Sequence, residues 1–434
     1  MARLMKDSGI PWIGEIPVDW EICKIKNAVR IYTGNSIKDE DKGNYEDSNN
    51  AIPYVATKDI DPTFQSIDYD NGMYVKNSDN SFKRAPSQSV LLCIEGGSAG
   101  KKLAFLEREV CFVNKLCCFH SNNILNKYLY YYLLSPAFTQ LFTSHISGLI
   151  GGVSVSQLGN FTATRPSLAE QTRIANFLDG ECARIDAIIE QTRATVEEYK
   201  KLKQSIITQA VTKGIRPNRP MKDSGIEWIG EIPEEWEVVK LKNVLSQQLQ
   251  YGASQSGIPF EVGLPRYIRI TDITLDGKLK DTDALSLSEE DASGYLLKNN
   301  DILFARSGAT VGKAFIYKEE YGRACFAGYL IKASLNNQLL PDLLFLYTQS
   351  SIYEEWKKQI FVQATIQNIG ADRYRELPII LQSLEEQTEI ISYLKEKCEK
   401  VDGLIKYKEI LLNELEIYKK SLIYEYVTGK KEAC

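Results

Sequence analysis

Two long stretches of the chain place apolar residues at intervals of three or four between charged residues. In the first stretch, Glu170 to about Val211, apolar or small residues recur at Ile174, Leu178, Cys182, Ile185, Ile189, Val196, Tyr199, Ile206 and Ala210. The second stretch has the same pattern at Leu394, Cys398, Val401, Ile405, Leu412, Leu415, Leu422 and Tyr426. This spacing predicts two amphipathic helices of roughly 40 residues, each about 60 Å long. Because one such helix alone would be marginal, we expect the two to pair, the alternative being that each lies on its own domain.

The helices belong to a repeat that covers the whole chain. The words MKDSGIPWIGEIPVDWEICKIKNA at residues 5–28 return as MKDSGIEWIGEIPEEWEVVKLKNV at residues 221–244, an offset of 216. The same offset relates SLAEQTRI, residues 167–174, to SLEEQTEI, residues 383–390. Solenoid repeats have periods of only about 20–50 residues. The sequence therefore predicts two copies of a whole domain with a constant frame.

The middle of each copy, about 30–160 and 245–380, is less well matched. YVATKDI at 54–60 aligns with YIRITDI at 267–273, and GGSAGKKLAF at 96–105 aligns with GATVGKAF at 308–315. Short β-rich runs alternate with one expected helix in each copy, KYLYYYLLSPAFTQLF and LPDLLFLYTQSSIYEEW. These middles predict α/β domains. We expect Tyr54 and Tyr267 to pack in the cores of these domains.

The breakers in VTKGIRPNRP divide the chain into successive parts. We predict a first domain at 1–165, with its opening motif at 5–28, and a first long helix at 166–213. A linker at 214–220 follows. The second domain covers 221–380, with its opening motif at 221–244, and the second long helix covers 381–430.

Composition is that of an ordinary globular protein, with 44% hydrophobic and 25% charged residues among 434. No apolar run reaches the roughly 18 residues of a membrane span and the start has no signal-peptide core, so we expect a cytoplasmic protein. The net charge of −5 argues weakly against a nucleic-acid partner, but local patches matter more than the total. Nine cysteines form no CxxC pair, and we expect reduced core residues.

Motifs for metal or phosphate chemistry are missing. The only histidines are His120 and His145, and no HExxH occurs, so no metal site is predicted. GATVGKA departs from the GxxxxGK[ST] phosphate loop in its spacing and in Ala314. A glycine-rich turn between strands, with Lys101, Lys102 and Lys313 near a polyanion, explains this segment, and a plain hairpin explains it equally well.

A nuclease-like set also occurs, with Asp342, Glu355 and Lys357 in the second copy. The residues between them have helical spacing, whereas such acids would come from neighbouring strands, and the first copy has no counterparts. No NPPY-like signature of an S-adenosylmethionine-dependent DNA methyltransferase is present either. We therefore predict a chain without an active site.

Two divergent α/β domains, each followed by a matched helix, together with MKDSGIEWIGEIPEEWE, SLEEQT and AVTKGI, resemble the specificity subunit of Type I restriction-modification systems. The resemblance covers essentially the whole chain. It implies two pseudo-symmetric target-recognition domains, each reading one half of an asymmetric bipartite DNA target, and two helices paired as an antiparallel coiled coil. One departure is that the first copy reads RPSLAEQ and the second LPIILQSLEEQ, so we expect a shorter connection into the first helix.

The resemblance also implies partners. The helices would dock methyltransferase subunits, two of them, and endonuclease–translocase subunits would then join. Those partners would use S-adenosylmethionine, ATP and magnesium, while this chain itself would hold no cofactor and catalyse nothing. A rod of about 60 Å could hold the domains over half-sites about one helical turn of DNA, 34–36 Å, apart.

A recognition domain needs cations for phosphates and polar side chains for base edges. The candidate DNA-binding residues of the first domain are Thr57, Lys58, Ser98, Lys101, Lys102, Ser154, Ser156 and Gln157. Those of the second are Arg269, Thr271, Arg306, Ser307, Lys313, Gln363, Gln367 and Asn368. For each of them, an ordinary solvated surface position is an equal alternative. Two other functions remain open: a coiled-coil scaffold without sequence-selective DNA binding, and a stand-alone endonuclease.

Overall fold

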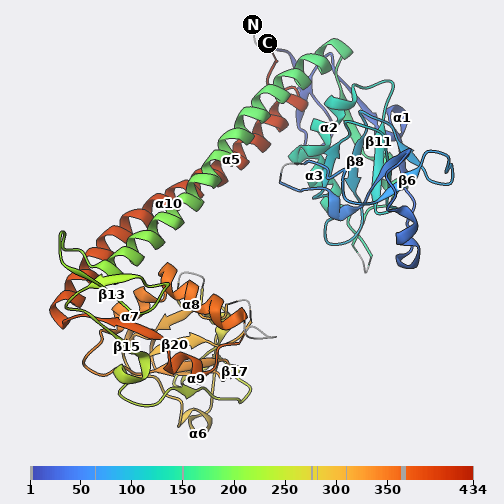
Figure 1. The fold of residues 1–434 in the computed structure, drawn as a ribbon. Coiled ribbons are helices and arrows are strands. Elements are labelled where there is room, and N and C mark those ends of the chain that lie inside the picture. Colours follow the sequence, from blue (N-terminus) through green and yellow to red (C-terminus); the bar gives the residue numbers. More distant parts are fainter. Residues whose placement is uncertain are drawn as a thin grey trace. The chain divides into compact units, whose positions relative to one another are not determined.

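The computed structural model describes residues 3–63, 65–148, 151–274, 277–280, 282–308, 310–362 and 368–433. The chain divides into two compact units. The first unit comprises Met1–Arg193 and Glu409–Cys434, and the second comprises Ala194–Lys408. Helices α5 (Leu168–Lys213) and α10 (Leu384–Val427) each contribute to both units (Figure 1). Within the described ranges, no helix is long and apolar enough to cross a membrane.

Helices α5 and α10 pair antiparallel in each unit. In the first unit, Asp186 accepts a hydrogen bond of 2.6 Å from Lys419, and Arg193 donates one of 3.0 Å to Glu416. In the second unit, Lys203 donates to Asp402 at 2.8 Å, and Arg216, three residues after the end of α5, bonds Glu389 of α10 at 2.9 Å. Residue numbers rise along α5 as they fall along α10. The predicted pairing as an antiparallel coiled coil is confirmed.

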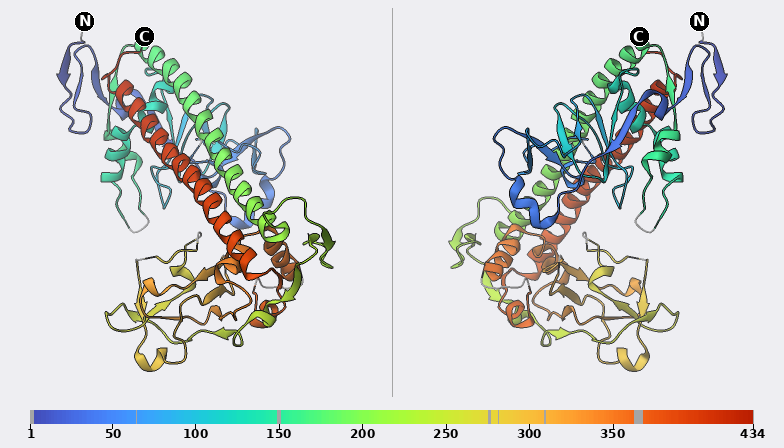
Figure 2. Two further views of the ribbon diagram at one scale, coloured as in Figure 1. Left: turned by 90° about the vertical axis from the view of Figure 1, so that its left-hand side faces the viewer. Right: turned by 90° about the vertical axis from the view of Figure 1, so that its right-hand side faces the viewer.

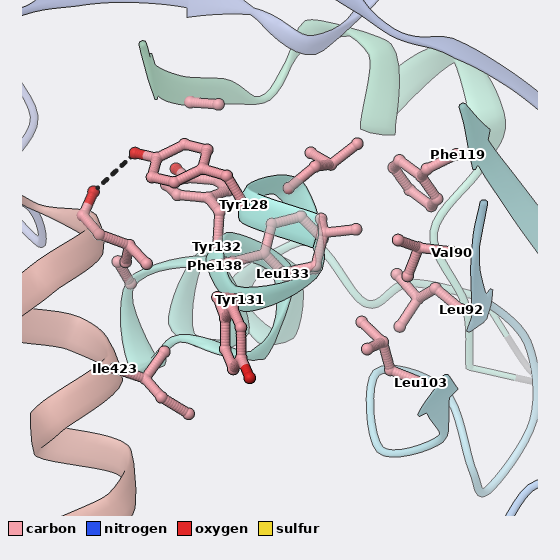
Figure 3. Packing of buried hydrophobic residues seen from close by; sticks show 14 of the residues in the cluster. Val90, Leu92, Leu103, Phe119, Tyr128, Tyr131, Tyr132, Leu133, Phe138 and Ile423 are labelled. Carbon is pink, nitrogen blue, oxygen red and sulfur yellow. Dashed lines mark hydrogen bonds between the residues drawn. The ribbon is translucent and has the colours of Figure 1, made fainter. Parts of the chain in front are cut away.

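The residues of the predicted seams lie inside these pairs. Ile174, Leu178 and Leu394 are 0–1% exposed, and every other seam residue is buried or half-buried. Phe177 and Tyr426 stack with ring centroids 4.4 Å apart. The ends of the helices also pack on the globular parts, since Ile423 of α10 joins the core of the first domain (Figure 3). The helices therefore both pair and lie on domains.

The first unit contains two four-stranded sheets, ordered β4-β11-β8-β9 and β6-β5-β10-β7. Their strands are β4 (Arg30–Thr33), β5 (Ala51–Val55), β6 (Tyr74–Lys76), β7 (Arg84–Ala85), β8 (Val90–Cys93), β9 (Leu103–Phe105), β10 (Val110–Phe112) and β11 (Leu116–His120). Most neighbours are antiparallel, but β5 and β10 are parallel, with Tyr54 opposite Cys111. Two small ladders complete the unit, β1 (Met5–Asp7) with β2 (Glu15–Pro17), and β3 (Glu21–Lys24) with β12 (Thr162–Arg165).

The second unit repeats the order of the first sheet as β16-β23-β20-β21, and its other sheet has the order β17-β19-β18-β22. In that other sheet β19-β18-β22 match β6-β5-β10, whereas β17 and β7 occupy opposite edges and do not correspond. The strands are β16 (Gln250–Tyr251), β17 (Ile258–Pro259), β18 (Arg266–Ile268), β19 (Leu285–Ser286), β20 (Ile302–Ala305), β21 (Ala314–Ile316), β22 (Ala324–Phe326) and β23 (Leu330–Ala333). The ladders are β13 (Met221–Asp223) with β14 (Glu231–Pro233), and β15 (Glu237–Lys240) with β24 (Pro378–Leu381). Strands β18 and β22 are parallel, with Tyr267 opposite Cys325, as in the first unit. The expected pseudo-symmetric α/β domains are confirmed.

The expectation of one helix over KYLYYYLLSPAFTQLF and one over LPDLLFLYTQSSIYEEW is wrong, because each of these segments covers two helices. The first has α2 (Asn126–Leu134) and α3 (Pro136–Ser144), and the second has α7 (Pro341–Tyr347) and α8 (Ser351–Val362). Ser135 caps α3 through a hydrogen bond of 3.4 Å from the amide of Phe138, and Pro136 occupies the first turn. Proline lacks an amide hydrogen and favours the first turn over a helix interior, so α2 cannot run on into α3.

In each copy, residues of the repeated sequence motifs link the opening motif to the start of the long helix. The indole Nε1 of Trp20 donates to Glu170 at 2.9 Å, and that of Trp236 donates to Glu386 at 2.8 Å. Both indoles are fully buried, at 0% and 1% exposed. Arg3 bonds Glu170 at 2.6 Å, as Arg219 bonds Glu386. A buried glutamate is therefore satisfied by an indole and a guanidinium in both copies.

The glutamine after each of these glutamates holds the helices of the domain. Gln171 accepts from the amide of Leu125, just before α2, and donates to the carbonyl of Pro166, both at 2.8 Å. Gln387 accepts from the amide of Leu340, just before α7, at 2.8 Å. The predicted shorter connection into the first helix is wrong, because two residues separate strand from helix in both copies, 166–167 and 382–383.

The first opening motif also meets the end of α10. Lys430 donates to the carbonyl of Ile13 at 2.6 Å, and Tyr424 bonds the same carbonyl at 3.2 Å. The first opening motif and the end of α10 consequently lie at the same end of the first unit (Figure 2). In the core, the hydroxyl of Tyr128 bonds the carbonyl of Val427 at 3.1 Å (Figure 3). The same hydroxyl bonds Thr164 at 2.7 Å. Residues more than 290 apart in sequence thus share one core.

Most cysteines and the two paired tyrosines lie in the cores. Among described residues, Cys93, Cys111, Cys117, Cys118, Cys182, Cys325 and Cys398 are buried free thiols, and Cys23 is half-buried. Burial raises the pKa of the Cys111 thiol to about 11 and that of Cys325 to about 12. Tyr54 and Tyr267 are each 5% exposed, which confirms that they pack in cores.

Candidate nucleic-acid interface

Three segments of the first domain converge at one end of the sheet β4-β11-β8-β9. The turn 94–102 connects β8 to β9, and Lys102 within it donates to the carbonyl of Thr57 at 2.7 Å. Thr57 begins η2 (Thr57–Asp59), the short helix that follows β5. The segment before α4 (Val155–Asn160) completes the set, because the amide of Val153 bonds the carbonyl of Ile94 at 3.0 Å. Side chains from three distant parts of the sequence are therefore brought to one surface.

The second domain brings the corresponding segments together. The turn 306–313 connects β20 to β21, and the carbonyl of Arg306 accepts from the amide of Ile369 at 2.8 Å. Ile369 leads into α9 (Ala371–Arg375), the counterpart of α4. The short helix η4 (Ile270–Asp272) follows β18, and Ile270 packs in the same cluster as Ala305, immediately before the turn. The arrangement of the three segments is thus duplicated.

Glycines shape these turns for a packing reason. Gly100 and Gly312 have φ of +74° and +83°, a conformation that favours glycine. A Cβ at Gly100 would lie 2.7 Å from the ring of Phe142 on α3, and one at Gly312 would lie 2.2 Å from Lys357 on α8. A Cβ at Gly96 or Gly308 would meet nothing within 4 Å. The turns are hairpins between antiparallel strands. In each turn one glycine, Gly100 or Gly312, allows a side chain of a helix to approach the backbone.

The polar candidates of the first domain have different local roles. Lys58, Lys101, Ser154 and Ser156 are exposed, and Thr57, Ser98, Lys102 and Gln157 are half-buried. Ser154 caps α4, because its hydroxyl accepts from the amide of Gln157 while the Gln157 side chain accepts from the amide of Ser154 at 2.9 Å. This reciprocal pair is the capping box that the spacing S-x-x-Q signals. Lys101 donates weakly to the carbonyl of Gly97 at 3.2 Å, so its ammonium stays near the surface.

The candidates of the second domain also differ among themselves. Arg269 is held by Asp272 through bonds of 2.7 and 3.1 Å, and that ion pair raises its pKa against the opposing effect of burial. Asn368 is exposed and lies opposite Ser307 in a β-bridge. Thr271 is exposed, and Arg306, Ser307 and Lys313 are half-buried. Gln363 and Gln367 lie outside the described residues. Base contact by any of these residues stays a prediction.

The sequence did not indicate the aromatic neighbour of Arg306. The guanidinium carbon of Arg306 lies 4.8 Å from the ring centroid of Tyr251, on β16. Tyr251 is 41% exposed, and nearby Tyr329, whose carbonyl accepts from the amide of Arg306 at 3.0 Å, is 65% exposed. Nothing in the sequence around Tyr251 indicates that its side chain will contact Arg306, in the turn that follows β20.

The residues of the nuclease-like set make separate contacts. Asp342 lies on α7 and bonds Lys318 at 3.4 Å, while Glu355 and Lys357 lie on α8 and bond Lys358 at 3.1 Å and Glu354 at 2.7 Å. The helical spacing predicted for this segment is confirmed. Among described residues, no group of three or more His, Cys, Asp or Glu could hold a metal ion.

The duplicated domain on paired helices defines a two-domain recognition scaffold, and comparison with known proteins gives its family. The model of the Type I restriction modification DNA specificity domain matches residues 17–198 and 233–416. The chain belongs to this family. The resemblance noted in the sequence is confirmed.

Individual relatives are similar over most of their length. The chain is 25% identical to the Type I restriction enzyme MjaVIII specificity subunit of Methanocaldococcus jannaschii over 96% of this chain and 93% of that protein. It is 23% identical to the EcoBI specificity subunit of Escherichia coli, over 76% of this chain and 70% of that protein. A solved structure from work on complex assembly and conformational transition of the type I R-M system shares the fold, with a TM-score of 0.72 and 17% identity over 96% of this chain and 99% of that one.

Proposed function

We propose that this chain is the DNA specificity subunit of a Type I restriction-modification complex, each domain reading one half of a bipartite target. The observation that carries the proposal is the duplicated convergence of three segments, on a frame whose contacts are the same in both copies. Trp20–Glu170 and Trp236–Glu386 keep the frame constant. The segments that meet at the sheet end carry different side chains in the two domains. A constant frame with two different reading surfaces fits an asymmetric target.

The chemistry of these surfaces suits DNA despite the acidic total. Lys58, Lys101 and Lys102 of the first domain, and Lys313 of the second, would neutralise phosphates. Serines, threonines and Asn368 can donate to or accept from base edges. Aspartates that cap the short helices are turned inward, as Asp59 and Asp272 are only 9% and 4% exposed. These two carboxylates therefore do not face a DNA phosphate directly.

The paired helices are the proposed docking surface for two methyltransferase subunits. Helix α10 exposes large apolar side chains that neither its partner helix nor a domain covers: Leu404 (47%), Tyr407 (64%), Ile410 (49%), Ile417 (58%) and Tyr418 (54%). Their spacing places them on one side of the helix, away from the seam. Exposed apolar residues gathered in this way are typical of a protein interface.

In the proposed complex the chemistry belongs to the partners. The methyltransferase subunits would use S-adenosylmethionine to modify adenines, and endonuclease–translocase subunits would use ATP and magnesium. The chain itself would supply recognition and geometry and hold no cofactor. We place this activity in the cytoplasm, where the host DNA is.

The test is a genome-wide map of modified adenines in the host with this gene intact and deleted. The proposal predicts that one asymmetric bipartite motif loses its methylation on deletion. An unchanged map, in a host shown to express the gene, would favour the coiled-coil scaffold instead. The Glu355→Ala variant tests the endonuclease alternative. If this chain is not a nuclease, cleavage by the assembled complex should not change.

A further inference from the structure

The main chain of Arg306 is fixed from both sides. It directly follows the buried strand β20, its amide donates to the carbonyl of Tyr329 at 3.0 Å, and its carbonyl accepts from the amide of Ile369 at 2.8 Å. These bonds tie the start of the turn 306–313 to β23 and to the segment before α9. The Cα position of this arginine is therefore set by the sheet and not by a free loop.

The side chain of Arg306 is restrained as well. Its guanidinium lies over the ring of Tyr251 at 4.8 Å, and the hydroxyl of Tyr251 accepts from the amide of Ala371 at 2.9 Å. The ring is thus held at its hydroxyl end, and the cation–π contact restrains the position of the guanidinium above it. Such a contact engages none of the N–H groups of the guanidinium in a hydrogen bond.

The donors of Arg306 are unused within the part of the chain that the structure describes. Its Nε is buried without a hydrogen-bond partner, and the group forms no ion pair. Three other arginines of this domain have acceptors: Arg269 is bonded by Asp272, Arg323 by Glu289, and Arg266 by the carbonyl of Lys280. A half-buried guanidinium with free donors is costly unless a ligand supplies acceptors.

The restrained position of the guanidinium and its unused donors narrow the class of ligand. A guanidinium presents two parallel N–H groups that fit a pair of acceptors in one plane, and the O6 and N7 atoms of guanine form such a pair in the major groove. A phosphate contact needs only a positive charge, and Lys313 in the same turn can supply that charge. Exposed Asn368, opposite Ser307, lies beside Arg306 and offers further polar groups for a base edge.

We propose that Arg306, held by Tyr251, reads a guanine in the half-site of the second domain. This inference rests on the proposed function. It also gives the asymmetry a cause, because the corresponding position in the first domain is Ile94. Ile94 follows β8 as Arg306 follows β20, and its carbonyl accepts from Val153 as that of Arg306 accepts from Ile369. Ile94 is 2% exposed and carries no donor in its side chain.

The experiment uses the complex with its methyltransferase and measures DNA binding. Replacing guanines of the half-site one at a time by 7-deazaguanine removes the N7 acceptor. At one guanine, wild-type binding should weaken by up to about 140-fold, the upper limit being the loss of a whole bidentate contact, because O6 remains as an acceptor. In the Arg306→Ala complex, the same replacement should have no effect. The Tyr251→Leu variant keeps Arg306 but should discriminate less between guanine and 7-deazaguanine. The control Arg375→Ala, which removes an exposed arginine of α9, should discriminate as the wild type does.

The outcomes separate the inference from the function on which it rests. A wild-type complex that binds no bipartite motif would contradict the proposed function. A wild-type complex that binds its motif but tolerates 7-deazaguanine at every position would overturn the role of Arg306. So would an Arg306→Ala complex that weakens equally on all sequences, which would indicate a phosphate contact. If the Arg306→Ala complex loses discrimination at one guanine of one half-site and recognises the other half-site unchanged, the proposal is supported.

Discussion

The indole Nε1 of Trp236 donates a hydrogen bond of 2.8 Å to Oε2 of Glu386, across 150 residues of sequence. The glutamate is 3% exposed and the indole 1%. The same contact between Trp20 and Glu170 occurs in the first copy. This pair explains why the opening motif and the helix head are repeated together: each buried carboxylate needs its own indole and arginine.

Substituting Trp236 by phenylalanine should destabilise the second unit by about 1.5–3 kcal/mol, the range for a hydrogen bond to a charged group. The measurement is urea unfolding followed by circular dichroism. Trp228→Phe is the matched control, because the Nε1 of Trp228 is buried without a partner among described residues. That change should cost less. Equal losses in the two variants would show that packing, and not the hydrogen bond, accounts for the effect.

The stability of the second unit should fall in acid through Glu386. Burial alone would raise the pKa of this carboxyl, but hydrogen bonds from Arg219 and Trp236 outweigh it and hold the pKa below its ordinary 4.5. The charged form is favoured by folding, so its contribution is complete above pH 4.5 and is lost as the pH falls through the lower, folded-state pKa. Thermal unfolding between pH 7 and pH 3 should show the advantage of wild type over Glu386→Gln shrinking. Parallel profiles of the two proteins would contradict this role.

Alanine at Gly100 should destabilise the first unit more than alanine at Gly96. Both glycines have positive φ, +74° and +80°, so both changes cost backbone strain of about 1–2 kcal/mol. Only Gly100 has a neighbour, the ring of Phe142 at 2.7 Å from the added Cβ, and overpacking adds about 1–3 kcal/mol. The difference in free energy of unfolding between the variants isolates the overlap. Equal values would mean that Phe142 moves aside without cost.

Glutamate at Tyr407 should weaken association with the methyltransferase while leaving the chain folded. Tyr407 is 64% exposed, so its loss removes little packing within the chain, but a charge in the proposed apolar docking surface would have to be desolvated. Co-purification and analytical ultracentrifugation with the methyltransferase measure the loss. Glu409→Ala, at an exposed position two residues along and on another side of the helix, should associate normally. Normal assembly by the Tyr407 variant would place the docking surface elsewhere.

Much of the frame could be predicted from sequence, because its signals are periodic or repeated. The helix seams follow from spacings of three and four, and the domain duplication from an offset of 216. The break between α2 and α3 was also readable, since Ser135–Pro136 is a helix start, yet the apolar run on both sides favoured one helix. The Ser154–Gln157 capping box likewise had its signature in the sequence.

The reading surface could be predicted only as a set of segments. Which side chains are free depends on contacts between strands distant in sequence, as with Arg306 on Tyr251 and Arg269 on Asp272. Arg269 and Arg306 have the same candidate role but differ in their contacts. The donors of Arg269 bond Asp272, whereas the Nε of Arg306 has no partner among described residues. No spacing along the chain distinguishes them, because β16 and β20 are brought near only by the sheet order β16-β23-β20-β21.

The most direct test of the central claim is an exchange of one recognition domain followed by a map of methylated adenines. Residues 30–160 would be replaced by the corresponding segment of a relative with a different target, leaving the opening motif and both helices unchanged. If each domain reads one half of the target, one half of the bipartite motif should change and the other half should stay the same. A chimera that still methylates DNA but changes both halves, or neither, would contradict it.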